Sequence, residues 1–123
     1  MTPVLQTYVE QSRANCLAAC IASILNLPLA EVPDTGGKSA FDQYTVLQAW
    51  LKERKGALLR VDGQVTPFLT GDVFYVLTGQ GPRGQRHAVV AQGNDIVHDP
   101  HPEGGGLLDR DGAYFLLLDT TIA

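Results

Sequence analysis

The sequence predicts one α+β domain in which a central N-terminal helix packs on a mainly antiparallel β-sheet. Two observations favour this class: the helix-like patterns all fall in the first half of the chain, and the strand-like segments all follow them. No helix-length segment separates the strands, whereas a parallel sheet needs crossover connections of that length. At 123 residues the chain suits one domain and is too short for two ordinary ones. We therefore expect residues 1–123 to form a single domain.

The first element is an expected extended arm over Met1–Gln11, which leads into a helix. Asn15 is a suitable N-cap for a helix that begins at Cys16. Apolar residues between Leu17 and Leu25 cover nearly every face of this helix. A helix that is apolar on all sides belongs in the middle of a domain.

A second helix is expected over Phe41–Lys55, because Tyr44, Leu47 and Leu51 form one apolar stripe and Gly56 can end it. The segments that follow are rich in Val, Leu, Tyr and Phe and are bounded by Gly, Pro and Asp, which is typical of strands. The expected strands are Ala57–Val61, Asp72–Leu77, His87–Gln92, Asp95–His98 and Ala113–Leu118. Between the second and third of these, Gly79–Arg86 is expected to be a loop.

Composition and charge narrow the classes of partner. The chain is 45% hydrophobic and 18% charged, which predicts a buried core. Its formal charge of −4 indicates no basic patch and argues against nucleic acid as a partner. No apolar run approaches the roughly 20 residues of a membrane helix, and the start of the chain lacks the pattern of a signal peptide. We expect a cytoplasmic protein without a membrane partner, whose oligomeric state the sequence leaves open.

Cys16 is a candidate nucleophile because of its place at the start of the first helix. The first N–H groups of a helix have no partner within it and carry the positive end of the dipole, which favours a thiolate. Cys20 lies four residues further along the same face, where the geometry for a disulfide is poor. Two alternatives stay open for Cys16, a small core residue and a metal ligand.

His87 and Asp99 are candidates for the groups that would assist this thiol. They flank a hairpin in which Gly93-Asn94 forms a good two-residue turn, and that register sets Asp99 opposite Ala88, one residue out of step with His87. A three-residue loop or a bulge would pair His87 with Asp99 directly and place both side chains on one face. The alternative is that Asp99 merely ends a strand.

Gln11 lies five residues before Cys16 and is a candidate donor to an oxyanion. A side-chain amide in this position can join the backbone N–H of the nucleophile in stabilising a tetrahedral intermediate. Gln6 is the other amide nearby, and a solvated surface glutamine is the alternative interpretation.

These residues together resemble the signature of the bacteriocin-processing, double-glycine-type cysteine peptidases, a bacterial family of the papain-like superfamily. The resemblance rests on Gln11, on Asn15–Cys20, on His87–Val90 and on Val97–Pro100. It implies a papain-like fold, with Cys16 as nucleophile, His87 as base, Asp99 as the group that orients His87, and Gln11 as oxyanion donor. The chain has Asn15 where the family usually has Asp and Leu17 where it usually has Gly.

The expected function is that of a cysteine hydrolase, a thiol peptidase that cleaves a peptide or amide bond of a peptide or protein substrate through a thioester acyl-enzyme. Such chemistry needs no cofactor. A deamidase, a transglutaminase-like acyl transferase and a non-catalytic binding module on the same fold stay open. A metal site is a further alternative, since His98 and His101 flank Asp99, although no close Cys-x-x-Cys or His-Glu-x-x-His pattern supports it.

Overall fold

The computed structural model describes residues 1–10, 14–62 and 72–121. Two helices pack on a five-stranded antiparallel sheet with strand order β1-β5-β2-β3-β4. This arrangement confirms the predicted α+β class. In chain order the elements are α1 (Cys16–Leu25), the short 3-10 helix η1 (Leu29–Glu31), α2 (Ala40–Glu53), β1 (Gly56–Val61), β2 (Phe74–Gln80), β3 (Arg86–Gln92), β4 (Asp95–His98) and β5 (Tyr114–Asp119).

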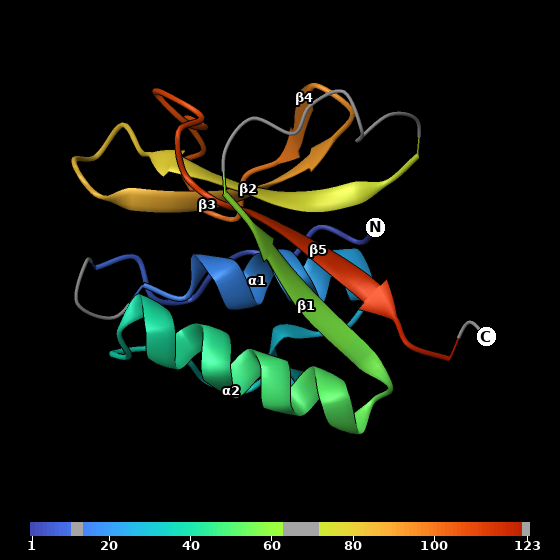
Figure 1. Cartoon of the computed structure of the whole chain (residues 1–123). Coiled ribbons are helices and arrows are strands. Elements are labelled where there is room, and N and C mark those ends of the chain that lie inside the picture. The colour runs from blue at the N-terminus through green and yellow to red at the C-terminus, as the bar shows by residue number, and fades with distance from the viewer. Residues whose placement is uncertain (11–13, 63–71, 122–123) are drawn as a thin grey trace.

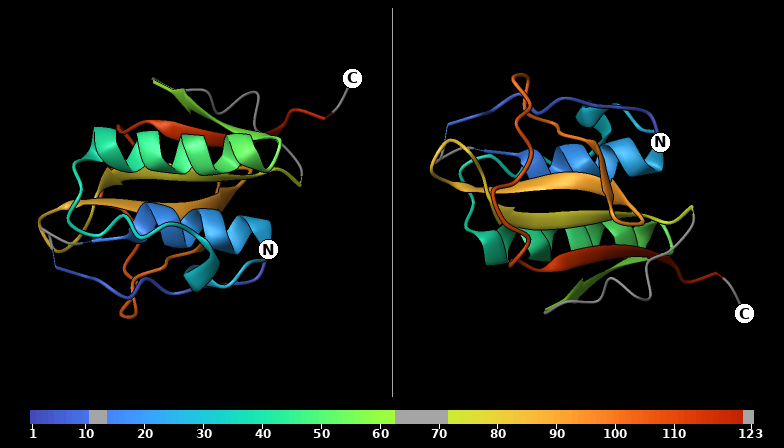
Figure 2. Two further views of the ribbon diagram at one scale, coloured as in Figure 1. Left: turned by 90° about the horizontal axis from the view of Figure 1, so that it is seen from below. Right: turned by 90° about the horizontal axis from the view of Figure 1, so that it is seen from above.

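Both helices lie on the same side of the sheet (Figure 1). α1 packs against β3 and β2, and α2 packs against β1. The N-terminal arm runs along α1 on the side away from α2 (Figure 2), and the backbone N–H of Thr2 donates to the carbonyl of Ser23 near the end of that helix. α1 is thus covered by the sheet and by the arm, and it shares an apolar cluster with Leu47 of α2, as its apolar faces predict.

The sheet is apolar on both faces. On the helix side, Ile21 of α1 and Leu47 of α2 are buried together with Val76 and Val90 of the sheet. On the other side a second cluster surrounds Tyr75 and includes Leu77, Val89, Ala91 and Tyr114. β3 is therefore buried on both faces over most of its length, which gives a rigid base for the residue near its start, His87.

Some element boundaries differ from the expected ones. Lys55, and not Gly56, adopts the left-handed conformation after α2, with φ of 59°, and Gly56 is already the first residue of β1. β2 continues to Gln80 and β3 begins at Arg86, so the loop expected over Gly79–Arg86 is a shorter hairpin connection.

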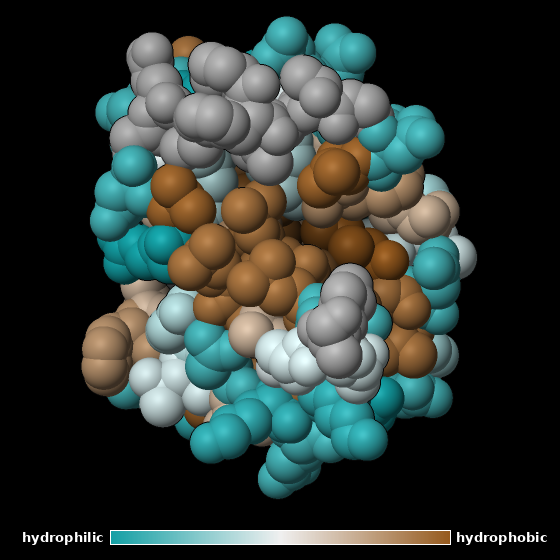
Figure 3. Space-filling model, turned by 45° about the vertical axis from the view of Figure 1, so that its right-hand side comes forward, coloured by the Kyte–Doolittle hydropathy of each residue, from teal (hydrophilic) through white to brown (hydrophobic). Residues whose placement is uncertain are grey.

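The outer side of β1 and β5 is also apolar. Leu59 and Leu118 are 45% and 46% exposed, whereas Leu58, the neighbour of Leu59, is buried against the helices. Figure 3 shows a broad apolar area on the side of the molecule that faces right in Figure 1. Among the residues described, no helix is long and apolar enough to cross a membrane.

Candidate active site

Cys16 is the first residue of α1, and its side chain is partly exposed. Cys20, one turn further on, is fully buried, and burial raises the pKa of its thiol well above the ordinary value. Neither cysteine is in a disulfide. Cys16 is therefore the thiol that a reagent or substrate can reach.

Asn15 stands at the N-cap position, but its side chain does not cap the helix. Its Oδ1 atom accepts hydrogen bonds from the backbone N–H groups of Thr7 at 3.2 Å and Tyr8 at 3.0 Å. Its Nδ2 atom donates to the hydroxyl of Thr7 at 3.0 Å. The side chain that was expected to cap α1 therefore connects the helix start to the N-terminal arm. The backbone N–H groups in the first turn of α1 accordingly make no hydrogen bond to the Asn15 side chain.

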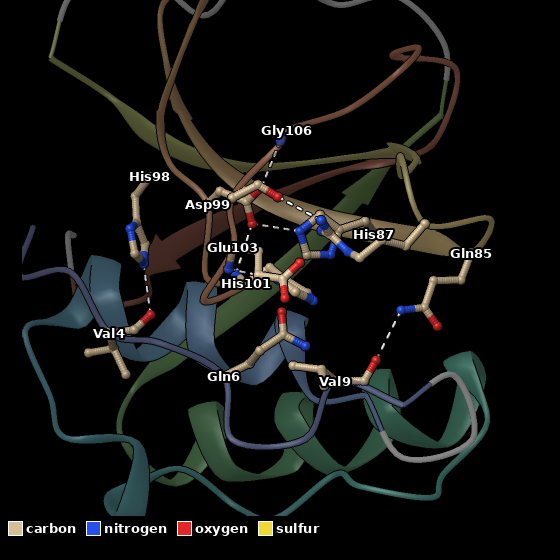
Figure 4. A network of polar contacts seen from close by, with 12 residues as sticks. Val4, Gln6, Val9, Gln85, His87, His98, Asp99, His101, Glu103 and Gly106 are labelled. Carbon is tan, nitrogen blue, oxygen red and sulfur yellow. Dashed lines mark hydrogen bonds and ion pairs between the residues drawn. The ribbon is translucent and has the colours of Figure 1, made fainter.

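His87 and Asp99 form a close, nearly buried pair (Figure 4). Nε2 of His87 lies 2.7 Å from Oδ1 of Asp99, and the two side chains are 4% and 11% exposed. Because an ionised carboxylate can only accept a hydrogen bond, Nε2 carries the proton. Asp99 also accepts from the backbone N–H groups of His101 at 2.9 Å and Gly106 at 2.8 Å. Three donors therefore fix the carboxylate that holds the His87 ring.

The electrostatics of the pair favour its charged form. Burial alone would lower the pKa of His87, but hydrogen bonds to Asp99 and Cys16 outweigh it and raise the pKa to about 9. Burial would likewise raise the pKa of Asp99, yet the bonds from His87, His101 and Gly106 lower it to about 2. Cys16 is among the groups that raise the pKa of His87, and both residues line one groove, so the structure brings Cys16, His87 and Asp99 to one place.

A β-bulge explains how Asp99 comes to share a face with His87. The turn gives the expected pairs Gln92 with Asp95 and Ala91 with Ile96, but the next pair is Val90 with His98. The extra residue lies in β4, so the shift runs opposite to the one that would pair His87 with Asp99 directly. Continuing the new register sets Asp99 opposite Val89, which shares a face with His87 because side chains alternate along a strand. The side chains of His87 and Asp99 then span the two-residue offset along the strands, and their polar atoms meet at 2.7 Å.

The two amides expected near Cys16 have different outcomes. Gln11 lies outside the described residues. Gln6 is buried, and its Nε2 donates to the carbonyl of Tyr8 at 2.8 Å. The side-chain amide of Gln6 is thus bonded within the arm. Gln85, which the sequence reasoning missed, donates to the carbonyl of Val9 at 3.1 Å and so holds the end of the arm beside the site. No sequence pattern marks this long-range contact.

The histidines near Asp99 have structural partners. Nε2 of His98 donates to the carbonyl of Val4 at 2.7 Å. Nδ1 of His101 accepts from the backbone N–H of Glu103 at 3.0 Å, and its ring stands edge-on to that of His87. Within the described ranges, no three His, Cys, Asp or Glu side chains are placed to hold a metal ion.

A groove of about 600 Å³ opens beside Cys16 and His87. It lies between the first turns of α1 and α2 and the strands β1, β2, β3 and β5. The residues that line it are Ala14, Cys16, Leu17, Lys38, Ala40, Phe41, Gln43, Tyr44, Arg60, Thr78, Gln85, Arg86, His87, Ala88, Ala113 and Phe115. A peptide-sized ligand in this groove would lie against the thiol.

Comparison of the chain with protein-family models, with curated proteins and with solved structures finds no match in any of the three.

Proposed function

We propose that this protein is a cysteine hydrolase of the papain-like kind that cleaves a peptide or amide bond through a Cys16-His87-Asp99 triad. The observation that carries the proposal is the position of His87, which contacts Asp99 on one side and Cys16 on the other. A nucleophile, a base that touches it and a third group that orients the base are the parts that acyl transfer requires.

The two ring nitrogens of His87 have separate tasks in this proposal. Nε2 is bonded to Asp99, which leaves Nδ1 to take the proton of Cys16. The resulting thiolate attacks the substrate carbonyl carbon, and the carbonyl electron pair moves to oxygen. His87 then returns the proton to the leaving amine as the C–N bond breaks, which produces a thioester. Water, deprotonated by His87, attacks the thioester and releases the acid and the free thiol.

Donors for the oxyanion would come from the start of α1. The N–H of Cys16 lies at a helix N-terminus that lacks a side-chain cap, so it is available to a negatively charged oxygen. Gln11 remains the proposed second donor, as the resemblance to the bacteriocin-processing peptidases implies. The chemistry needs no cofactor, because the thiolate and the imidazolium supply both the nucleophile and the proton.

The primary test is selective alkylation of the native protein by iodoacetamide at pH 6, followed by peptide mapping. We expect Cys16 to react at least about 10-fold faster than N-acetylcysteine, because in the proposed triad His87 takes the proton of the Cys16 thiol. Cys20→Ala should keep this reactivity, and His87→Ala should remove it. Preferential labelling of Cys20, or labelling of Cys16 at the rate of a free thiol, would overturn the triad.

The type of acyl transfer is tested by mass spectrometry of a peptide mixture incubated with wild type and with Cys16→Ala. New peptide termini that depend on Cys16 indicate a peptidase. A gain of about 1 Da at glutamine side chains, the mass difference between an amide and an acid, would instead indicate the deamidase alternative, which shares the same acyl-enzyme. Fast alkylation of Cys16 without either product would favour the binding module.

A further inference from the structure

The groove beside Cys16 differs in charge from the chain as a whole. The protein has a formal charge of −4, yet among the described residues no carboxylate lines the groove, whereas Lys38, Arg60 and Arg86 line it beside His87. Lys38 precedes α2, Arg60 belongs to β1 and Arg86 begins β3. The total charge predicted no basic patch, and this prediction is wrong for the groove, because folding brings together cations from three separate parts of the chain.

These cations keep most of their capacity to bind an anion. Arg60 pairs with Asp62 and Arg86 with Asp111, each at 3.2 Å, and all four side chains are more than half exposed. Exposed ion pairs of this kind contribute little free energy and open readily to a competing carboxylate. For Lys38, no side chain in the described part of the protein forms an ion pair with the ammonium group.

The rest of the lining is largely apolar and aromatic. Phe41 on the first turn of α2 is 77% exposed, which is unusual for so large an apolar side chain. The rings of Tyr44 on α2 and Phe115 on β5 pack with centroids 6.0 Å apart, and Leu17 follows Cys16 on α1. Such a surface favours an apolar side chain of a ligand, because binding removes both from water.

We propose that this groove selects the substrate, and that it binds peptides in which an apolar side chain has aspartate or glutamate neighbours. The apolar side chain packs on Phe41, Tyr44 and Phe115, and the carboxylates pair with Lys38 and the two arginines. This inference rests on the proposed function, since the groove becomes a specificity site because Cys16 lies in its wall. It adds the substrate class, an acidic and apolar peptide segment, which the triad alone does not define.

The charge of the groove is tested by comparing two alkylating agents of similar size, the anion iodoacetate and the neutral iodoacetamide. The ratio of their alkylation rates at Cys16 reports the electrostatic potential near the thiol. This ratio does not depend on whether the groove binds the residues before or after the bond that is cleaved. We expect Lys38→Glu and Arg60→Glu each to lower this ratio by about two- to five-fold at low salt, with a smaller change at 0.5 M salt. Lys52→Glu, a reversal of equal charge on α2 outside the groove, should leave the ratio unchanged.

The peptide preference is tested by protection of Cys16. Two pools of short peptides, one with Glu-Phe-Glu cores and the other with Lys-Phe-Lys cores, are added before iodoacetamide. We expect the acidic pool to slow alkylation of Cys16 at least about three-fold where the lysine pool has no effect, and Lys38→Glu to weaken that protection. Acidic peptides with alanine in place of phenylalanine should protect less.

The outcomes separate this inference from the proposed function. The specificity inference is wrong, and the triad is unaffected, if Cys16 is alkylated fast at pH 6 but both peptide pools protect it equally. The same conclusion follows if the ratio of alkylation rates is unchanged in Lys38→Glu and Arg60→Glu. Alkylation of Cys16 at the rate of a free thiol withdraws the triad, and the specificity inference falls with it.

Discussion

Replacing Asp99 with asparagine removes one negative charge from beside His87 while an oxygen stays in nearly the same place. That oxygen can still accept from the backbone N–H of His101 or Gly106, so Asp99→Asn is a gentler change than Asp99→Ala. What the variant loses is the charge-assisted bond to His87, 2.7 Å long in the wild type. The substitution therefore tests the charge of the pair more than its packing.

The expected loss of stability follows from the pKa of Asp99. Folding lowers this pKa from 3.8 to about 2, and at about 1.4 kcal/mol per pKa unit the shift contributes about 2 to 3 kcal/mol of unfolding free energy at neutral pH. Because the folded-state pKa is the lower one, this contribution is fully present above the unfolded value and is lost as pH falls through the folded value. About 1 kcal/mol of it should remain at pH 3.

Urea unfolding of wild type and Asp99→Asn between pH 7 and pH 3 measures this contribution directly. The difference in unfolding free energy should be about 2 to 3 kcal/mol at pH 7 and about half as large at pH 3. Asp95→Asn, at an exposed carboxylate of β4, is the matched control and should differ from wild type by less than about 0.5 kcal/mol throughout. A difference for Asp99→Asn that does not shrink on acidification would refute the reasoning. The same variant should slow alkylation of Cys16 at pH 6 by about 10-fold or more, because His87 loses the anion that keeps it protonated.

Three further substitutions test the remaining parts of the site. In the wild type, stability should fall as pH rises from about 6.5 to 9, because folding raises the pKa of His87 to about 9, and urea unfolding of His87→Ala should lack this decline. Asn15→Ala removes both bonds to the arm's backbone and one to Thr7, and should lower the unfolding free energy by about 1–3 kcal/mol, measured by thermal or urea unfolding. Gln11→Ala should slow acylation of Cys16 by an acylating reagent about 100-fold or more with an unchanged melting temperature, and an unchanged acylation rate would remove Gln11 from the site.

The sequence predicts well those elements whose residue pattern reflects local surroundings alone, such as burial on all sides or a short turn. α1 is apolar on all faces, and its residues Ala18–Ser23 are all buried, so composition alone reveals its central place. The antiparallel sheet follows from the short connections between strands. The proximity of His87 and Asp99 follows from a local hairpin, because the Gly93-Asn94 turn nearly fixes which residues can meet.

What the sequence could not predict depends on contacts between distant segments. The bulge in β4 rests on one extra residue, Val97, whose side chain differs little from those of a regular strand. Asn15 has the ordinary preference for an N-cap, yet two backbone N–H groups of the arm take its oxygen instead. The basic groove is hidden in the same way, since Lys38 and Arg86 are far apart in sequence and the total charge is negative.

The arm links these distant segments around the candidate site. At its middle, the backbone N–H of Gln6 donates to the carbonyl of Pro100, the residue after Asp99, at 2.9 Å. Two residues further on, Tyr8 donates to Asn15, the residue before Cys16. The arm therefore connects the loop that carries the carboxylate to the helix that carries the thiol, while β3 supplies the histidine between them. Because a catalytic triad tolerates errors of only about 0.5 Å, a segment bonded to both flanks positions the site although it contributes none of the three reacting groups.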